Sequence, residues 1–97
     1  KQVMRIVVAP QAAEDLRDAY EFISRDNPNA AGRVLAHIVE LIGMLASESV
    51  MGRDVRLKDG RRVKTWPVPP YRIYYRVRGQ ELDVIRVYHQ ARRPIER

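Results

Sequence analysis

The sequence predicts a single α+β domain in which a helical hairpin packs on one face of a small, mainly antiparallel sheet. Three observations lead to this fold class. The 97 residues suffice for one modest hydrophobic core. Two stretches of the first half repeat apolar residues every three or four positions, as amphipathic helices do. Three runs of the second half have the composition and alternation of strands. With one more strand at the start, the element order is β-α-α-β-β-β, and residues 1–97 are expected to form one domain.

The first half predicts a strand and two helices. The run "VMRIVVAP" is β-branched and closed by Pro10, which indicates a strand over about residues 3–8. Pro10 then suits the first turn of a helix over about residues 10–26. Asn27 can cap a second helix, over about 28–47, with Pro28 at its first position. The two apolar stripes consist of Ala12, Ala13, Leu16, Ala19, Tyr20 and Ile23, and of Ala31, Val34, Leu35, Ile38, Leu41, Ile42 and Leu45.

The second half predicts a loop followed by three strands. The stretch "SESVMGRDVRLKDG" carries turn formers and has no periodicity, so we expect a loop of about a dozen residues. Strands are predicted near residues 62–68, 71–78 and 81–89. The last two form a tight antiparallel hairpin around Gly79.

Strand alternation assigns side chains to the two faces of this sheet. The face beneath the helices is predicted to hold Tyr71, Ile73, Tyr75, Val77, Ile85 and Val87. The open face is predicted to hold Arg72, Tyr74, Arg76, Val84, Arg86 and Tyr88. Basic groups interleaved with aromatic rings can contact phosphates and stack on bases. Alternatively, these long side chains only shield the polar side of a one-sided sheet.

The composition narrows the classes of partner and site. Eighteen Lys and Arg against twelve Asp and Glu give a net charge of +6, which favours an anionic partner such as nucleic acid or an acidic protein segment. The basic excess lies in the second half. Without cysteine, and with only two histidines, we expect no metal and no cofactor. His37 flanks the second apolar stripe and is given no role. No apolar run is long enough to cross a membrane, so we expect no membrane partner and a cytoplasmic protein.

The stretch "VIRVYHQARRPIE", residues 84–96, holds the strongest candidate for chemistry. It begins as a strand and ends with His89 close to Tyr88, Arg92 and Arg93. A histidine among arginines could be part of a nuclease site, as a general acid or base beside groups that stabilise a phosphate. The same stretch could be a strand end with solvated charges, in which His89 has a structural or contact role.

Several motifs, taken in order, resemble the toxins of the RelE/ParE superfamily of bacterial toxin–antitoxin systems. The segment "APQAAEDLRDAYEFI" is similar to the first helix of that family, so the resemblance spans nearly the whole chain. The later motifs are "MGR" at 51–53, "KTWP" at 64–67, "YRIYY" at 71–75 and "VYHQAR" at 87–92. The resemblance implies a compact α+β toxin that a cognate antitoxin neutralises with an acidic, disordered carboxyl-terminal segment.

The superfamily divides by target. RelE-like members cleave messenger RNA in the ribosome without a metal, through attack of the 2′-hydroxyl on the adjacent phosphate, whereas ParE-like members inhibit DNA gyrase. The RelE-like alternative would use Lys64, Arg72, His89 and Arg92 on the ribosome and mRNA. However, the lysine pair of that site is represented by Lys64 alone, its final tyrosine has no counterpart in the sequence, and arginine is a poor proton acceptor.

The ParE-like motifs fit the sequence without missing parts, so the resemblance favours a gyrase inhibitor with no firm catalytic residue. A plain RNA-binding module is a third hypothesis, but no known RNA-binding signature is present. The residues predicted to contact a partner are Lys64, Trp66, Arg72, Tyr74, Arg76, Arg86, Tyr88, Arg92 and Arg93.

Overall fold

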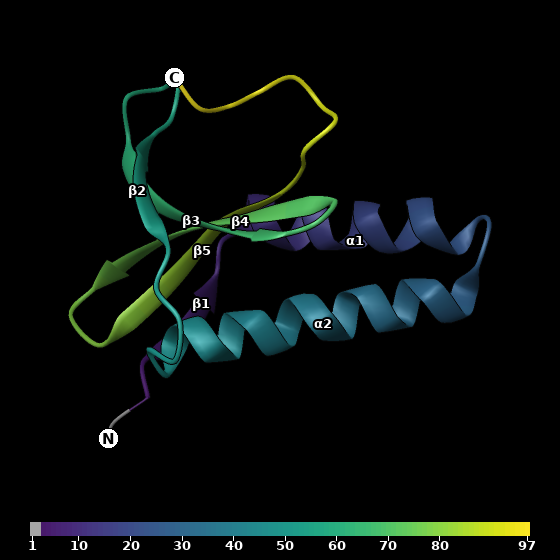
Figure 1. The fold of residues 1–97 in the computed structure, drawn as a ribbon, viewed down its shortest axis with the longest axis horizontal. Helices are drawn as coiled ribbons and strands as arrows, with labels where there is room; N and C mark the ends of the chain where they lie inside the picture. The colour runs from purple at the N-terminus through teal and green to yellow at the C-terminus, as the bar shows by residue number, and fades with distance from the viewer. Residues whose placement is uncertain (1–2) are drawn as a thin grey trace.

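The computed structural model describes residues 3–97 and places two helices against a five-stranded sheet (Figure 1). The strand order in the sheet is β1-β5-β4-β3-β2, with β1 parallel to β5 and every other pair antiparallel. The predicted α+β class is therefore confirmed. The elements are β1 (Arg5–Val8), α1 (Pro10–Ser24), α2 (Pro28–Ala46), β2 (Arg53–Arg56), β3 (Arg62–Val68), β4 (Tyr71–Arg78) and β5 (Glu81–His89).

Both helices begin where the sequence predicts. Pro10 opens α1, and the side chain of Asn27 accepts a hydrogen bond from the amide of Ala30 at 3.1 Å, which caps α2. α2 is long and apolar enough to span a bilayer, but this criterion uses only length and composition, and the core helices of globular proteins also meet it. Its apolar stripe is instead buried in the protein at Ala31, Ile38, Leu41, Ile42, Leu45 and Ala46.

The segment predicted as a loop contains a strand. β2 pairs antiparallel with β3 at one edge of the sheet, with Val55 opposite Val63. Four residues, three of them charged, are too few to show a strand period in the sequence. β2 forms because β3 offers it a hydrogen-bonding edge, which is a contact that local patterns do not contain.

The two faces of the sheet carry separate apolar clusters. The main core, under the helices, includes Ile73, Tyr75 and Val87, as predicted. A second cluster on the opposite face consists of Leu57, Val63, Tyr74 and Ile85, with Ile95 packed against it. The carboxyl-terminal segment, residues 90–97, thus covers part of the face that was predicted to be open.

The predicted faces of Val84 and Ile85 are wrong. Val84 is fully buried in the main core, and Ile85 lies in the second cluster. The register between β4 and β5 shifts at Tyr74/Tyr75, where Tyr74 pairs with Arg86 and Tyr75 with Val84, so Ile85 is an extra residue. A bulge of this kind reverses the alternation of every residue that precedes it.

Candidate functional site

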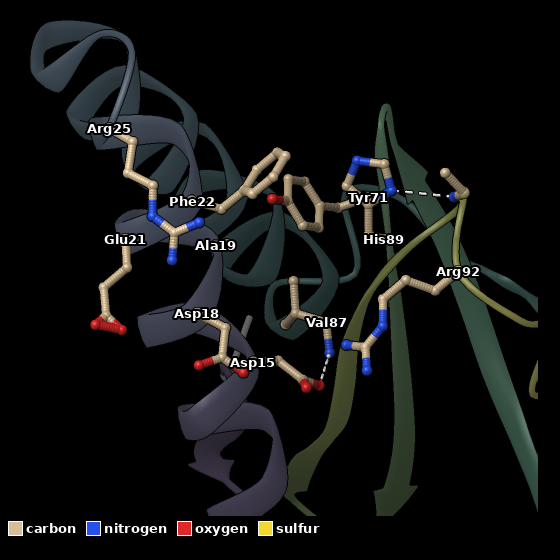
Figure 2. Close-up of a pocket in the computed structure, with 11 residues that line it drawn as sticks. Asp15, Asp18, Ala19, Glu21, Phe22, Arg25, Tyr71, Val87, His89 and Arg92 are labelled. Carbon is tan, nitrogen blue, oxygen red and sulfur yellow. Dashed lines mark hydrogen bonds between the residues drawn. The ribbon is translucent and has the colours of Figure 1, made fainter.

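An open cavity of about 450 Å³ lies between α1 and the ends of β4 and β5. Its apolar lining comes from Ala19, Phe22, Tyr71 and Val87, and the His89 ring lies next to that of Tyr71 (Figure 2). The His89 ring meets Tyr71 edge-on at 5.0 Å and Phe22 at 6.4 Å between centroids. Burial raises the pKa of Tyr71 above its ordinary value. An apolar group that entered this cavity would contact aromatic rings.

The charged lining of the cavity has both signs. Asp18 and Glu21 lie along α1, while Arg25 and Arg92 come from the end of α1 and from the carboxyl-terminal segment. None of these four side chains has an ion pair among residues 3–97. They are free to bind the charged groups of a ligand around its apolar part.

His89 is held by its own strand end. Its Nδ1 accepts a hydrogen bond from the amide of Ala91 at 3.0 Å. A neutral imidazole has one nitrogen lone pair, so this bond assigns the proton to Nε2. The acceptor nitrogen of the ring is therefore occupied by the backbone and does not face a substrate in this conformation.

Only two of the four residues of the alternative nuclease site come together: His89 and Arg92 line the cavity, and Lys64 and Arg72 do not. In β4 and β5, Tyr71 pairs with His89 and Arg72 with Tyr88, so Arg72 and His89 project from opposite faces. Arg72 donates to Thr65 Oγ1 at 3.2 Å on the face opposite the helices. Lys64 lies on β3, where its Nζ donates to Asp54 at 2.9 Å.

Arg86, one of the predicted partner-binding residues, is engaged inside the protein. Its Nε and one terminal nitrogen donate to the Asp15 carboxylate at 2.7 and 3.0 Å, and the amide of Val87 donates to the same carboxylate at 3.0 Å. The hydrogen-bonded Asp15 raises the pKa of Arg86. Sequence reasoning missed Asp15, although it falls at helical spacing between the buried Ala12 and Ala19.

Tyr74 was also expected on the open face, and it is buried. Its hydroxyl donates to the Glu96 carboxylate at 2.6 Å. Burial first, and then this acceptor, raise the pKa of Tyr74 well above its ordinary value. Tyr74 anchors the carboxyl-terminal segment and has no polar group left for a partner.

The remaining predicted contact residues occupy different sides. Trp66 packs against the main core on the helix side, and Arg76 on the other face is half-buried, with its Nε unbonded among the described residues. The Tyr88 ring contacts the guanidinium groups of Arg86 and Arg92 at 4.9 and 5.1 Å from its centroid. Its hydroxyl donates to the carbonyl of Arg93, whose side chain is exposed. These residues do not form one continuous site.

No group of three or more His, Cys, Asp or Glu side chains within residues 3–97 could hold a metal ion. The lining of the cavity offers aromatic, apolar and charged contacts for binding. Phe22, whose side chain is exposed at its mouth, was missed by the sequence analysis. The signal was present: Asp15, Asp18 and Phe22 follow one another at spacings of three and four along one side of α1.

Known proteins with the same sequence pattern and fold are toxins. The family model described as "ParE toxin of type II toxin-antitoxin system, parDE" matches residues 6–94. Y4kP, a candidate toxin of Sinorhizobium fredii, is 32% identical over 79 residues, which cover 81% of this chain and 80% of that protein.

Solved structures agree with this result. The chromosomal ParDE system of P. aeruginosa matches with a TM-score of 0.73 and 24% identity, covering 90% of this chain and 96% of that chain. The RelBE2 toxin–antitoxin complex of Mycobacterium tuberculosis matches with a TM-score of 0.67 and 22% identity, covering 91% and 99%. A YoeB/ParE toxin from Agrobacterium tumefaciens is 25% identical, with a TM-score of 0.55 and coverage of 89% and 98%. The chain belongs to the ParE toxin family of type II toxin–antitoxin systems, within the RelE/ParE superfamily.

Proposed function

We propose that this toxin inhibits DNA gyrase and that a cognate antitoxin neutralises it. The family match over residues 6–94 carries the gyrase proposal. The geometry supports the gyrase proposal by weakening the nuclease alternative, because Arg72 and His89 lie on opposite faces of the sheet and the Nδ1 of His89 already accepts a backbone hydrogen bond. Cleavage of RNA would need a proton acceptor and phosphate-stabilising cations around one reacting atom.

Two assays with the purified chain test this proposal. We expect it to block supercoiling of relaxed plasmid by gyrase and to leave ribosome-bound messenger RNA intact. Codon-biased messenger cleavage with untouched gyrase would reverse the choice in favour of the RelE-like alternative. In that case His89→Ala and Arg72→Ala should each slow cleavage by about a hundredfold or more. Under the gyrase proposal the two substitutions act only through binding or folding.

The antitoxin proposal uses the cavity beside α1. An acidic, amphipathic segment that orders on contact could place an apolar side chain in the cavity against Phe22 and Tyr71, with its carboxylates near Arg25 and Arg92. The net charge of +6 would accelerate the encounter with an acidic partner. We therefore expect faster association at low salt, measured by stopped flow with the protein encoded by the adjacent reading frame.

A matched pair of substitutions tests the location. Phe22 and Val39 are both 60% exposed, but only Phe22 lines the cavity, while Val39 lies on α2. Phe22→Ser should weaken antitoxin binding by about tenfold or more, as loss of an aromatic anchor does. Val39→Ser should leave the dissociation constant unchanged. Equal effects of the two substitutions would contradict this docking site.

A further inference from the structure

The net charge of the protein is concentrated in one region. Residues 53–64 and 93–97, here called the basic lobe, contain eight Lys and Arg and three acids, a net charge of +5. The rest of the chain contains ten Lys and Arg and nine acids. Nearly all of the protein's net charge of +6 is therefore carried by these seventeen residues.

The fold joins the two segments of the basic lobe. The carboxyl-terminal segment runs beside β2, with Leu57 and Glu96 paired as an antiparallel bridge. The amide of Lys58 donates to the carbonyl of Ile95 at 2.7 Å, and that of Arg97 to the carbonyl of Arg56 at 2.9 Å. The carboxyl terminus lies beside β2, away from the two helices (Figure 1).

The three acids of the basic lobe are all paired. Asp54 binds Lys64 at 2.9 Å, Asp59 binds Arg61 at 2.9 Å, and Glu96 lies 3.7 Å from Arg53. The other five cations have no ion pair among the described residues, and these are Arg56, Lys58, Arg62, Arg93 and Arg97.

Two of these arginines come from paired strands and a third from the chain segment beside them. Arg56 and Arg62 are directly opposite each other across β2 and β3, and Arg97 is hydrogen-bonded to Arg56 on the other side. Adjacent strands are about 4.8 Å apart. Like charges directly opposite in a sheet are destabilising, so the chain retains an arrangement that costs stability in isolation. A bound anion with repeated charges would reverse that cost.

We infer that the basic lobe binds the phosphate backbone of duplex DNA. The alternative anionic partner is an acidic protein segment, but a segment that folds on binding needs apolar contact as well as charge. The large exposed apolar residues all lie outside the lobe: Val3, Ile6, Val7, Val8, Tyr20, Phe22, Val39, Met51 and Val77. Four of the five free cations are arginines, which bind phosphate in a bidentate manner.

Duplex DNA fits better than a single strand. Single-stranded nucleic acid is held by stacking its bases on aromatic side chains. The basic lobe has no aromatic residue, and the nearby Tyr88 ring already contacts Arg86 and Arg92. Contact through the phosphates alone predicts binding without sequence preference, with a dissociation constant of about 10⁻⁴ to 10⁻⁶ M at physiological salt.

The expected salt dependence follows from the number of free cations. If all five contact phosphates, the logarithm of the association constant should fall against the logarithm of salt concentration with a slope of about −4.5. The measurement is fluorescence anisotropy of a labelled duplex of about 20 base pairs with the full chain, between about 50 and 200 mM KCl.

Two charge-matched variants locate the contact. R56Q/R62Q/R93Q removes three charges from the basic lobe, and R17Q/R25Q/R33Q removes three exposed arginines of the helical hairpin. The first should reduce the slope by about 2.7 and weaken binding by about tenfold or more at the lowest salt, whereas the second should bind as the parent does. The charge-preserving variant R56K/R62K/R93K should keep the slope, which separates loss of charge from loss of structure.

Other outcomes would overturn the inference. Equal losses in both glutamine variants would mean that diffuse net charge causes the binding. An RNA duplex of the same sequence bound about tenfold more tightly would make RNA the ligand. A poly-glutamate of equal charge that displaced the probe as well as unlabelled DNA would make the site one for acidic protein. Gyrase is absent from this assay, so its result stands apart from the supercoiling test.

Discussion

Removing the carboxylate of Asp15 tests whether Arg86 has a structural role or is available to a partner. Asp15 lies on the buried side of α1 with its side chain 3% exposed, and Arg86 on β5 is 19% exposed. β1 pairs with β5 only as far as Val84. Beyond that point the edge of β5 is open, and the Asp15 carboxylate accepts a hydrogen bond there from the amide of Val87. One carboxylate thus joins α1 to the last strand.

Asp15→Ala should lower the free energy of unfolding by about 3–5 kcal/mol. Removing one partner of a buried pair leaves the other charge uncompensated, and the loss of the acceptor for Val87 adds to that cost. Domains of this size are stable by about 5–15 kcal/mol, so the variant should lose a large part of its stability. Urea denaturation near neutral pH, followed by far-UV circular dichroism, measures the change.

Two controls make the reasoning refutable. Asp18→Ala, one turn along α1, removes an exposed carboxylate without an ion pair among the described residues and should change stability by about 0.5 kcal/mol or less. Asp15→Leu combined with Arg86→Met removes both charges and should recover much of the loss. A cost below about 1 kcal/mol for Asp15→Ala would show that Arg86 does not depend on this pair.

Two further predictions concern the packing of β2 and the carboxyl-terminal segment. A Cβ at Gly52 would lie 2.4 Å from the carbonyl oxygen of Thr65, so Gly52→Ala should cost about 1–3 kcal/mol or more in urea denaturation. Gly43→Ala on α2, where a Cβ meets nothing within 4 Å, should instead stabilise by about 0.5–1 kcal/mol. Because the pKa of Tyr74 is raised in the folded state, its stabilising effect is complete below the ordinary pKa near 10 and is lost as pH rises beyond it. Tyr74→Phe should therefore flatten the decline of unfolding free energy between about pH 9 and 11, and an unchanged decline would contradict this account.

The sequence predicted the elements whose patterns are local. Both helices follow from apolar spacing and from Pro10, Asn27 and Pro28, and the three long strands begin and end where alternation places them. β2 was missed because its formation depends on β3. The exchange of Val84 and Ile85 was missed because a bulge is a property of two paired strands, and one strand read alone does not show it.

The candidate site was less predictable for a related reason. The sequence shows which residues are charged or aromatic, but partners from distant segments decide which of them are free. Arg86 and Tyr74 are bonded to Asp15 and Glu96, residues 71 and 22 positions away. Conversely, Arg56 occurs in a stretch predicted to be a loop and Arg62 at the start of a predicted strand, and only the pairing of β2 with β3 and with the carboxyl-terminal segment brings them beside Arg97.

The two proposed partner surfaces have different chemistry and share only the carboxyl-terminal segment, in which Arg92 lines the cavity and Arg93 begins the second part of the basic lobe. The cavity beside α1 has aromatic walls and charges of both signs, whereas the basic lobe has free cations and none of the large exposed apolar residues. An antitoxin segment in the cavity would therefore leave Arg56, Arg62 and Arg97 accessible. We expect the toxin–antitoxin complex to retain the salt-dependent DNA binding of the basic lobe. Anisotropy measured with the complex and with the R56Q/R62Q/R93Q complex would show this, since any DNA affinity of the antitoxin itself is the same in both. If the two complexes bound DNA alike, the antitoxin would have to cover the basic lobe as well, and neutralisation would act by masking it.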